Sequence, residues 1–401
     1  MSGYVVDMEG RFRLTKKPPF LTPGYQAVGQ KLDDVKGIRK RVPLEKDTTY
    51  DVPLHPQQTV VQFNSTYLET TGRNERRRGD AVGWGLALGF VGLSVSNGII
   101  FAIMRFITDF NIVYLSVCLI LAFSMILLFF VPLINVLSTE LFTTWHSPIR
   151  FNRKTRKVYV RQYNRKVEVY NWDELTFFIA YISEDRDIRA VALDKDGETV
   201  TGMFALAFKN DVFDKSLISY FEFIRRYMEG DDQQLKEVKE AIRYIYPIHK
   251  KRETPLMSFK RLILNEVHHD HENMEYPERT FEFQPVTLVI LPLLALRYAG
   301  RVISMLTSYR HRFSSDIQAE CQIDPNDPYD LNKDLPAGNL EQRNQPMWKT
   351  VVYSVGIAIA TIVMMFVGAF IIDLMGAARP HGDYPSMVGK LWYVVSLGWL
   401  S

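Results

Sequence analysis

A run of basic residues offers the clearest chemistry in this chain. Eight arginines and lysines, with no acidic residue among them, lie between His146 and Val167. Near a bilayer surface, anionic lipid headgroups attract such charges by about 1 kcal/mol each. The run therefore predicts contact with anionic lipid, although the same charges could serve only to fix a membrane topology. The residues predicted to make that contact are Arg150, Arg153, Lys154, Arg156, Lys157 and Arg161.

Two further groups contain metal-ligand residue types but lack the spacing of a metal site. His268–Glu272 holds three histidines and two acids, yet adjacent residues point apart and cannot converge on one ion. Asp324–Asp330 has aspartates at intervals that suggest a calcium loop. It lacks the glycine and the terminal glutamate of such a loop, and two prolines interrupt it. The first group is interpreted as a solvated loop and the second as a turn.

Catalytic motifs are missing from the sequence. It has no glycine-rich phosphate loop, nucleophile elbow or zinc-peptidase signature. Asp173 and Glu174 are adjacent carboxylates, but they precede an expected strand, where acids most simply end a turn. We expect no enzyme activity, no cofactor and no metal. The formal net charge of +3 is too small to indicate a nucleic-acid partner.

Three long apolar stretches must position these residues. Ala81–Met104, Phe110–Thr139 and Thr350–Ile372 carry no charged residue, and roughly 20 apolar residues suffice for a membrane-spanning helix. The first two predict a transmembrane hairpin over residues 81–139, with helices at 81–104 and 110–139. The third predicts a transmembrane helix over 349–373. Gly85 and Gly89 stand four residues apart, a spacing that lets helix backbones pack closely.

The remaining segments follow from this topology. Positive charges on both outer flanks of the hairpin place those flanks in the cytoplasm. Residues 1–80 are then a basic cytoplasmic N-terminal region, and residues 283–348 an interfacial helix with a polar loop. Residues 374–401 form a short extracytoplasmic or interfacial tail. Whether residues 283–306 span the membrane stays open, as does the side on which the C-terminus lies.

Residues 145–282 predict a cytoplasmic α+β domain. Alternating polar and apolar residues indicate strands, and Asp196-Gly197 indicates a hairpin turn. The expected strands are Lys157–Gln162, Lys166–Tyr170, Leu175–Ile182, Ile188–Leu193 and Thr199–Phe208, and the expected helices are Val212–Met228 and Gln233–Tyr246. This order is typical of a pleckstrin-homology-like antiparallel barrel or sheet capped by a helix, and a generic α+β domain fits almost as well.

Several short motifs resemble one family. They are RFNRKTRKVY from Arg150 to Tyr159, YNWDE from Tyr170 to Glu174, FEFIRRYMEG from Phe221 to Gly230, Glu320 with Cys321, and DPNDPY from Asp324 to Tyr329. The chain resembles an uncharacterised family of proteobacterial membrane proteins, a domain of unknown function, often found in type VI secretion gene neighbourhoods. The resemblance implies a multi-pass protein of the bacterial inner membrane, and it implies no catalytic residues.

The sequence and the resemblance together favour a non-enzymatic role in bacterial competition. The leading hypothesis is an immunity protein that binds a membrane-targeting toxin. One alternative is a membrane-anchored adaptor or scaffold for a secretion-system partner, and another is a membrane-permeabilising effector. The expected partners are anionic lipid headgroups and one protein, and the oligomeric state stays open.

Overall fold

The computed structural model describes the chain mainly over residues 27–89, 131–259 and 285–331. Within these ranges it leaves out residues 36–39, 58, 73–74, 76–77, 162–165, 183–184, 207–213, 243 and 246–251. Elsewhere it describes residues 4–6, 12–14 and 338–339, and single positions or pairs between 116 and 124 and between 352 and 388. The predicted C-terminal helix and tail therefore lie largely outside the described residues.

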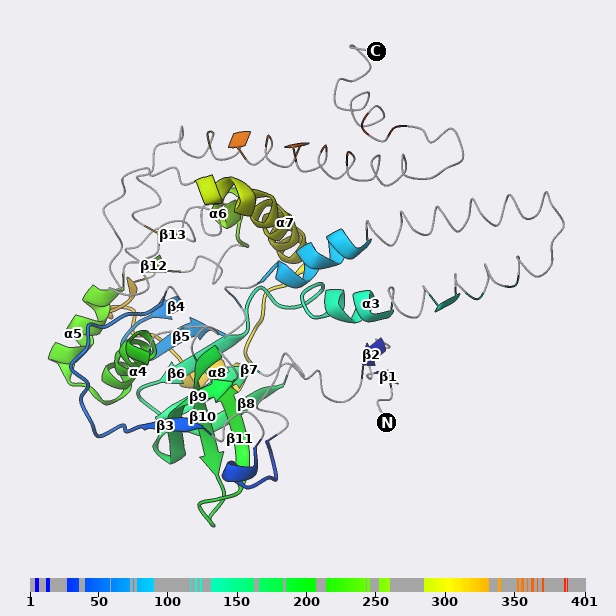
Figure 1. Cartoon of the computed structure of the whole chain (residues 1–401). Coiled ribbons are helices and arrows are strands. Elements are labelled where there is room, and N and C mark those ends of the chain that lie inside the picture. Colours follow the sequence, from blue (N-terminus) through cyan, green and yellow to red (C-terminus); the bar gives the residue numbers. More distant parts are fainter. Residues whose placement is uncertain are drawn as a thin grey trace.

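Two antiparallel sheets form the centre of the molecule (Figure 1). The five-stranded sheet has the order β4-β5-β6-β7-β8, and the four-stranded sheet has the order β11-β10-β9-β3. The strands of the first are β4 Val60–Phe63, β5 Tyr67–Thr71, β6 Pro148–Asn152, β7 Lys157–Arg161 and β8 Val167–Asn171. Those of the second are β3 Arg41–Leu44, β9 Leu175–Ile182, β10 Asp185–Leu193 and β11 Val200–Ala205. Two short pairs, β1 Tyr4–Val6 with β2 Phe12–Leu14 and β12 Tyr244–Ile245 with β13 Gly338–Asn339, form separate two-stranded sheets, and Ile245 of β12 packs in the main core.

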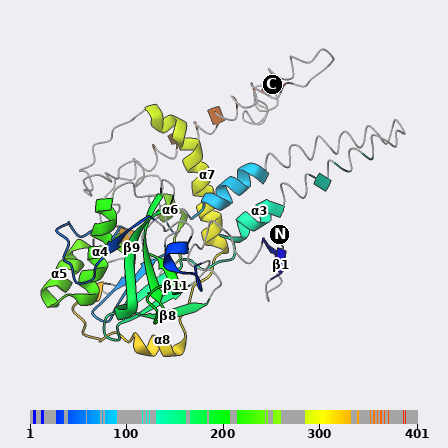
Figure 2. The same cartoon turned by 60° about the horizontal axis from the view of Figure 1, so that its bottom comes forward.

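Short helices complete the described part. They are η1 Leu32–Asp34, α3 Val131–Ser138, η3 Trp172–Glu174, α4 Asp214–Glu229, α5 Asp232–Ala241, α6 Pro255–Phe259, α7 Pro285–Thr307 and α8 Ser315–Glu320. Residues 80–89 are also helical. In both cartoon views, this segment and α3 lie side by side, and α7 runs past them (Figures 1 and 2).

Local sequence signals explain the β10–β11 hairpin, whose position the sequence predicted correctly. Gly197 adopts a φ of 69°, a left-handed conformation that glycine accepts without steric cost. The carboxylate of Asp196 accepts hydrogen bonds from the backbone amides of Glu198 and Thr199, at 2.9 and 2.8 Å. The turn is therefore encoded within a few residues.

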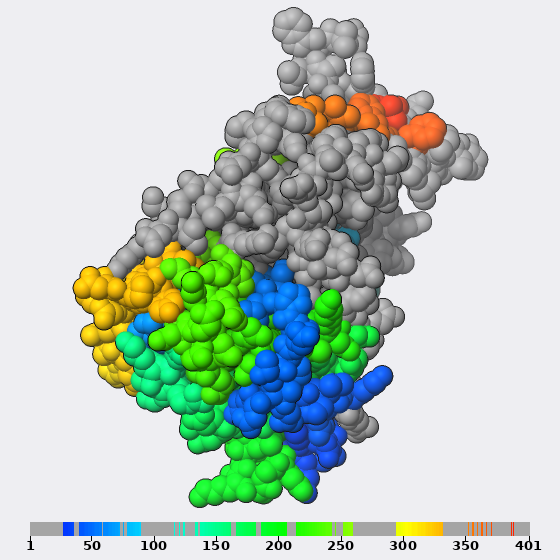
Figure 3. Space-filling view, turned by 90° about the vertical axis from the view of Figure 1, so that its left-hand side faces the viewer, coloured from blue at the N-terminus to red at the C-terminus, as the bar shows by residue number. Residues whose placement is uncertain are grey.

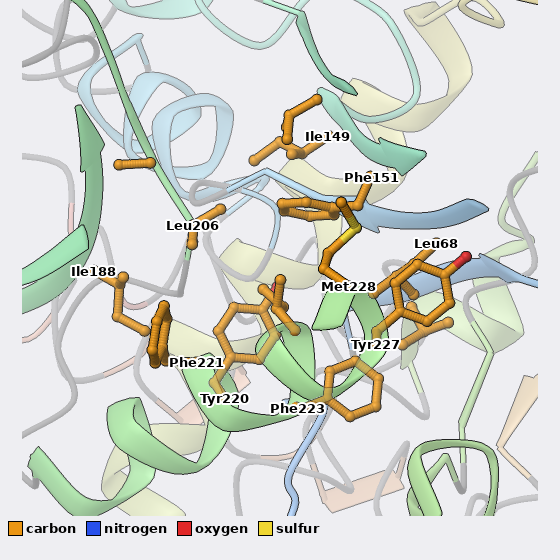
Figure 4. Close-up of a cluster of buried hydrophobic side chains, with 14 of the residues drawn as sticks. Leu68, Ile149, Phe151, Ile188, Leu206, Tyr220, Phe221, Phe223, Tyr227 and Met228 are labelled. Carbon is orange, nitrogen blue, oxygen red and sulfur yellow. The ribbon is translucent and has the colours of Figure 1, made fainter. Parts of the chain in front are cut away.

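Helix α4 supplies much of the main core. Its predicted apolar face is buried, and Tyr220, Phe223 and Tyr227 on other faces are buried as well. Figure 4 shows its aromatic side chains beside Phe151 and Leu68 of the five-stranded sheet and Ile188 of β10. The side of α4 away from the sheets is covered by other segments, which accounts for burial all round.

That cover comes from the N-terminal segment and from α5. The Gln57 side chain donates a 3.1 Å hydrogen bond to the backbone oxygen of Ser216, and Arg226 forms a 2.8 Å ion pair with Glu237 of α5. In the space-filling view, the blue N-terminal residues lie directly beside the green residues of α4 and α5 (Figure 3). The helix is thus enclosed between the sheets and these two segments.

The N-terminal region is part of the sheets. Strand β3 pairs with β9, placing Val42 opposite Ile179, and β5 pairs with β6, placing Leu68 opposite Phe151. The sequence prediction began the folded domain at residue 145 and left these strands out. Their partners lie far away in the chain, so their own short sequences do not reveal the pairing.

Glycines allow α7 to approach the segment that contains residues 79–89. A Cβ atom added at Gly300 would lie 2.1 Å from the backbone oxygen of Gly79 and 2.5 Å from the backbone nitrogen of Gly83. Both neighbours are backbone atoms, so no side chain can move aside. The close crossing therefore requires glycine at position 300.

The predicted fold class of a transmembrane hairpin, a capped cytoplasmic domain and a C-terminal transmembrane helix is wrong. In the part of the chain that the structure describes, no helix is long and apolar enough to cross a membrane. Two antiparallel sheets with few helices take its place. The assignment to the inner membrane as a multi-pass protein is corrected by the same finding. An apolar run alone cannot distinguish a spanning helix from one packed against protein, and most of residues 90–130 and 349–373 lies outside the described residues.

Candidate functional site

The predicted lipid-contact residues lie on one pair of strands and on the turn between them. Strands β6 and β7 are antiparallel, and Arg150 stands opposite Tyr159. Alternation along the strands places Phe151 and Val158 in the main core and turns Arg150 and Tyr159 to the other face. Phe313 and Cys321 cover that other face, where they form a second apolar cluster with Tyr67 and Tyr159.

Arg150 is held inside the protein. Its Nε and Nη2 atoms donate hydrogen bonds of 3.0 and 2.5 Å to the same carboxylate oxygen of Glu69. Its guanidinium carbon lies 4.2 Å from the ring centroids of both Tyr67 and Phe313. Cation–π contacts of this kind are strongest when the cation is removed from water. Arg150 therefore ties β6 to β5 and to the segment before α8.

Two histidines complete this buried cluster. His146 Nε2 lies 2.9 Å from the second carboxylate oxygen of Glu69. Burial alone would raise the pKa of Glu69, but the opposing effects of Arg150 and His146 lower it to about 2. Burial, together with the nearby charge of Arg161, lowers the pKa of His311 to about 4. At neutral pH the cluster thus holds an ionised carboxylate and a neutral His311.

The turn between β6 and β7 is held by a second set of carboxylates. Arg156, at a φ of 55°, donates hydrogen bonds of 2.8 Å to Asp173 through Nε and 2.7 Å to Glu229 through Nη2. Glu229 also accepts a hydrogen bond from Trp172 Nε1 at 2.5 Å. Because Glu229 ends α4, this cluster fastens the turn to the helix that fills the core.

The other predicted lipid-contact residues are divided between internal bonds and the surface. Lys157 forms a 2.8 Å ion pair with Glu320, and Arg153 donates a hydrogen bond to the backbone oxygen of Gly230. Arg161 is buried, whereas Lys154 is exposed. The structure brings the six residues onto one strand pair and its turn, and it bonds Arg150, Arg153, Arg156 and Lys157 to other parts of the fold, although only Arg150 and Arg161 are buried. Contact with anionic lipid stays a prediction.

Gly85 and Gly89 lie where the helix of residues 80–89 faces α3. A Cβ atom added at Gly85 would lie 2.6 Å from Cδ2 of Leu137, and one at Gly89 would lie 3.9 Å from Cδ2 of Leu133. We call residues 80–89 and α3 the helix pair. Several of its exposed side chains are apolar, and Trp84 among them is 58% exposed. We call these side chains the apolar face; they are Trp84 and Leu88, one helical turn apart, together with Leu86 and Ile134.

Glu140 joins the two members of the helix pair. Its carboxylate accepts hydrogen bonds of 3.0 to 3.3 Å from the backbone amides of Gly79, Ala81 and Val82. These amides begin the helix of residues 80–89, where a carboxylate satisfies the unpaired donors. Sequence analysis missed this role because Glu140 follows its helix and caps another one almost 60 residues earlier.

A buried arginine joins the helix pair to α7. Arg301 is fully buried, and it donates two 2.8 Å hydrogen bonds to Glu253 and one of 3.1 Å to Glu75. Arg78, close to Glu75 in the chain, donates through Nε to Ser304 of α7 at 3.0 Å. An arginine within an apolar helix was a visible signal, but its partners come from distant segments. The apolar face is therefore carried on a rigid support.

The remaining sequence candidates that the structure describes are held in turns and internal bonds. Asp327 accepts hydrogen bonds from the backbone amide and hydroxyl of Ser65, at 2.7 and 2.8 Å, and so fixes a turn. Asp173 is occupied by Arg156, as described, and Glu174 accepts a hydrogen bond from Asn171. His268–Glu272 lies outside the described residues. In the ranges that the structure describes, no group of three or more histidines, cysteines and acids is placed to hold a metal ion.

Comparison with known proteins identifies the family. The model of a family of unknown function, DUF6708, matches residues 125–325, which is half of the chain. This chain belongs to that family. The matched range contains the basic strands β6 and β7, α4 and Arg301. No curated protein and no solved structure matches the chain.

Proposed function

We propose that this protein acts by binding another protein, as an immunity protein that captures a toxin. The resemblance to proteobacterial proteins found near type VI secretion genes supports this setting. The observation that carries the proposal is the apolar face, an exposed aromatic and aliphatic surface on an anchored helix pair. Large exposed apolar patches are typical of protein–protein interaction sites.

The composition of the apolar face suits a binding site. Trp84 has the residue type most enriched among residues that dominate binding energy. Burying a leucine side chain such as Leu88 contributes roughly 1.5–3 kcal/mol. Because Glu140 and Arg301 hold the support in place, little ordering of the face is needed on association.

The use of the charged residues also supports a binding role. Glu69, Asp173 and Glu229 are each bonded to an arginine that holds two segments together. Burial and ion pairing give Glu69 its low pKa, so this perturbed group has a structural cause. We therefore propose binding rather than catalysis as the activity of this protein.

The test compares two pairs of substitutions. The full-length chain carrying Trp84→Ser and Leu88→Ser is expressed with the toxin encoded beside its gene. We expect at least a tenfold loss of toxin affinity and loss of protection, with the urea midpoint unchanged. The matched control is Val169→Ser with Val28→Ser, which removes exposed apolar residues elsewhere. Undiminished capture by the first variant would contradict the proposed site.

The alternative function is an adaptor for a component of the secretion machine. The same apolar face would serve it, because the surface does not specify the partner. In that case, the Trp84→Ser and Leu88→Ser variant loses secretion while protection from the toxin is unchanged. Loss of protection with normal secretion favours the immunity function.

A further inference from the structure

A strained aromatic residue follows α3, one member of the helix pair. Phe142, four residues after α3, adopts a φ of 54° and is 60% exposed. A left-handed conformation is unfavourable for a bulky non-glycine residue, and such strain is concentrated at functional sites. Exposure of the ring gives no compensating burial in the free protein. The conformation therefore presents Phe142 to the outside at a cost in stability.

A second exposed aromatic residue is fixed next to it. The backbone amide of Tyr309 donates a 2.9 Å hydrogen bond to the oxygen of Thr143, and the amide of Trp145 donates one of 2.8 Å to the oxygen of Tyr309. Tyr309 is 42% exposed. Residues 142–145 and 308–309 thus run together, and they display two aromatic side chains from a fixed backbone.

Arginines surround these aromatic residues. Arg252 donates a 2.8 Å hydrogen bond to the backbone oxygen of Ser308, and Arg310 and Arg312 directly follow Tyr309. All three are exposed. Among the residues that the structure describes, neither Arg310 nor Arg312 has a carboxylate within ion-pair distance.

The acids beside this region are committed elsewhere. Glu140 caps the helix of residues 80–89, and Glu253 is buried against Arg301. The exposed groups next to the two aromatic rings are therefore mainly cationic. We call Phe142, Tyr309, Arg252, Arg310 and Arg312 the aromatic–arginine surface.

We infer that the aromatic–arginine surface binds an acidic segment of a protein partner, one in which an aromatic residue is flanked by aspartate or glutamate. The inference rests on the proposed function and gives the chemistry of the partner. Planar guanidinium groups bind carboxylates with two parallel hydrogen bonds. The fixed rings offer a surface for an aromatic side chain. Phe142 follows α3, so this surface and the apolar face are attached to the same helix.

The first experiment measures binding of a fluorescent peptide to the full-length protein. The peptide has the sequence Glu-Asp-Phe-Glu-Glu-Asp-Phe-Glu, and its counterpart carries lysine in place of every acid. We expect the acidic peptide to bind and the basic one not to bind. Rising salt should weaken binding because it screens the charges. Absence of acidic-peptide binding, or equal binding of both peptides, would overturn the inference.

Two variants locate the site. Phe142→Gly removes the ring and suits the left-handed backbone, so it should not destabilise the protein. Arg310→Gln with Arg312→Gln removes two exposed charges. Each should weaken the acidic peptide at least fivefold with the melting temperature maintained. Lys154→Gln with Lys195→Gln removes the same charge from exposed positions elsewhere and should have no effect. Equal weakening by this control would overturn the assignment.

A third measurement distinguishes the inference from lipid binding and from the proposed immunity function. Binding to phosphatidylglycerol vesicles without binding of the acidic peptide would replace the protein partner by a lipid surface and overturn the inference. Peptide binding that depends on Phe142, with no capture of the toxin, would contradict the immunity function alone. Toxin capture that survives both variants would contradict the inference alone.

Discussion

Two arginine–carboxylate clusters hold the same pair of strands, one inside the protein and one at its surface. In both, the shortest contact between the charged groups is 2.5 Å. The side chains of Arg150 and Glu69 are only 11% and 6% exposed, whereas those of Arg156 and Asp173 are 36% and 54% exposed. Although the distances are equal, breaking the buried pair should cost more stability than breaking the exposed one. At the surface, water can solvate the charge that has lost its partner, and inside the protein it cannot.

The buried cluster should show the largest effect. In Glu69→Gln the charge of Arg150 stays buried without a carboxylate, and removal of one partner from a buried pair costs about 3–5 kcal/mol. We expect a loss of that size in the free energy of unfolding, measured by urea denaturation. The double variant Glu69→Leu with Arg150→Met should recover part of it. A loss below about 1 kcal/mol for Glu69→Gln would remove the distinction between the two clusters.

The pair between Arg301 and Glu253 should give a smaller loss despite complete burial. In Glu253→Gln, Arg301 keeps the carboxylate of Glu75 at 3.1 Å. The variant loses hydrogen bonds to a charged group, so we expect about 2 kcal/mol in the urea-derived free energy of unfolding. Glu75→Gln combined with Glu253→Gln should cost more than the sum of the single changes. Simple additivity would show that Glu75 does not compensate.

The dependence of stability on pH should also distinguish the buried cluster from the surface cluster. The pKa of His311 is about 4 in the folded protein, below its ordinary value of 6.5. Stability is therefore unaffected above pH 6.5 and declines as the pH falls from 6.5 to 4, because the unfolded chain binds the proton more readily. In His311→Gln the urea midpoint should depend less on pH over that range. In Asp173→Asn its decline with falling pH should be unchanged. Glu69, with a pKa of about 2, adds a loss only as the pH falls below 4.5.

The surface cluster should show a small effect. Arg156→Gln removes two partly exposed ion pairs, with Asp173 and Glu229, and such pairs typically contribute about 0.2–1 kcal/mol each. We expect a loss of at most about 2 kcal/mol, smaller still at high salt, in the same urea experiment. The variant Lys31→Gln breaks a more exposed pair, with Glu198, and should show a smaller loss than Arg156→Gln. A loss for Arg156→Gln as large as that for Glu69→Gln would contradict the comparison.

The smallest effect on stability should come from Lys154→Gln, since this side chain is exposed. The variant tests lipid contact instead. If the basic strands bind anionic lipid, it should weaken sedimentation of the protein with phosphatidylglycerol vesicles, with neutral phosphatidylcholine vesicles as control. Unchanged sedimentation would leave the basic residues with the internal roles that the structure shows.

Elements with local signals were predicted well. Strands β7 to β11 and helix α4 were predicted near their observed positions, because alternation, a turn sequence and a helical apolar face each lie within one short segment. Helix α5 was predicted to continue to Tyr246 but ends at Ala241, before β12. Strands β3 to β6 were not predicted, and those of them that pair with distant segments have short sequences that do not reveal the pairing. The apolar stretches were assigned to a membrane because an apolar run by itself does not reveal what it packs against.

The candidate site shows the same contrast between features encoded locally and features that depend on distant partners. The sequence by itself determined that residues 150–161 form a cationic run and that an alternating strand begins at Lys157, because residue type and spacing settle both points. Only the tertiary structure decided where those charges go. Arg150 meets Glu69 across 81 residues of chain, and Lys157 meets Glu320 across 163. The spacing of the cations does not reveal a carboxylate so far away in the chain, yet that carboxylate bonds the cation within the protein, buried for Arg150 and at the surface for Lys157. Burial then sets the free energy of each bond, and burial is a property of the packed fold.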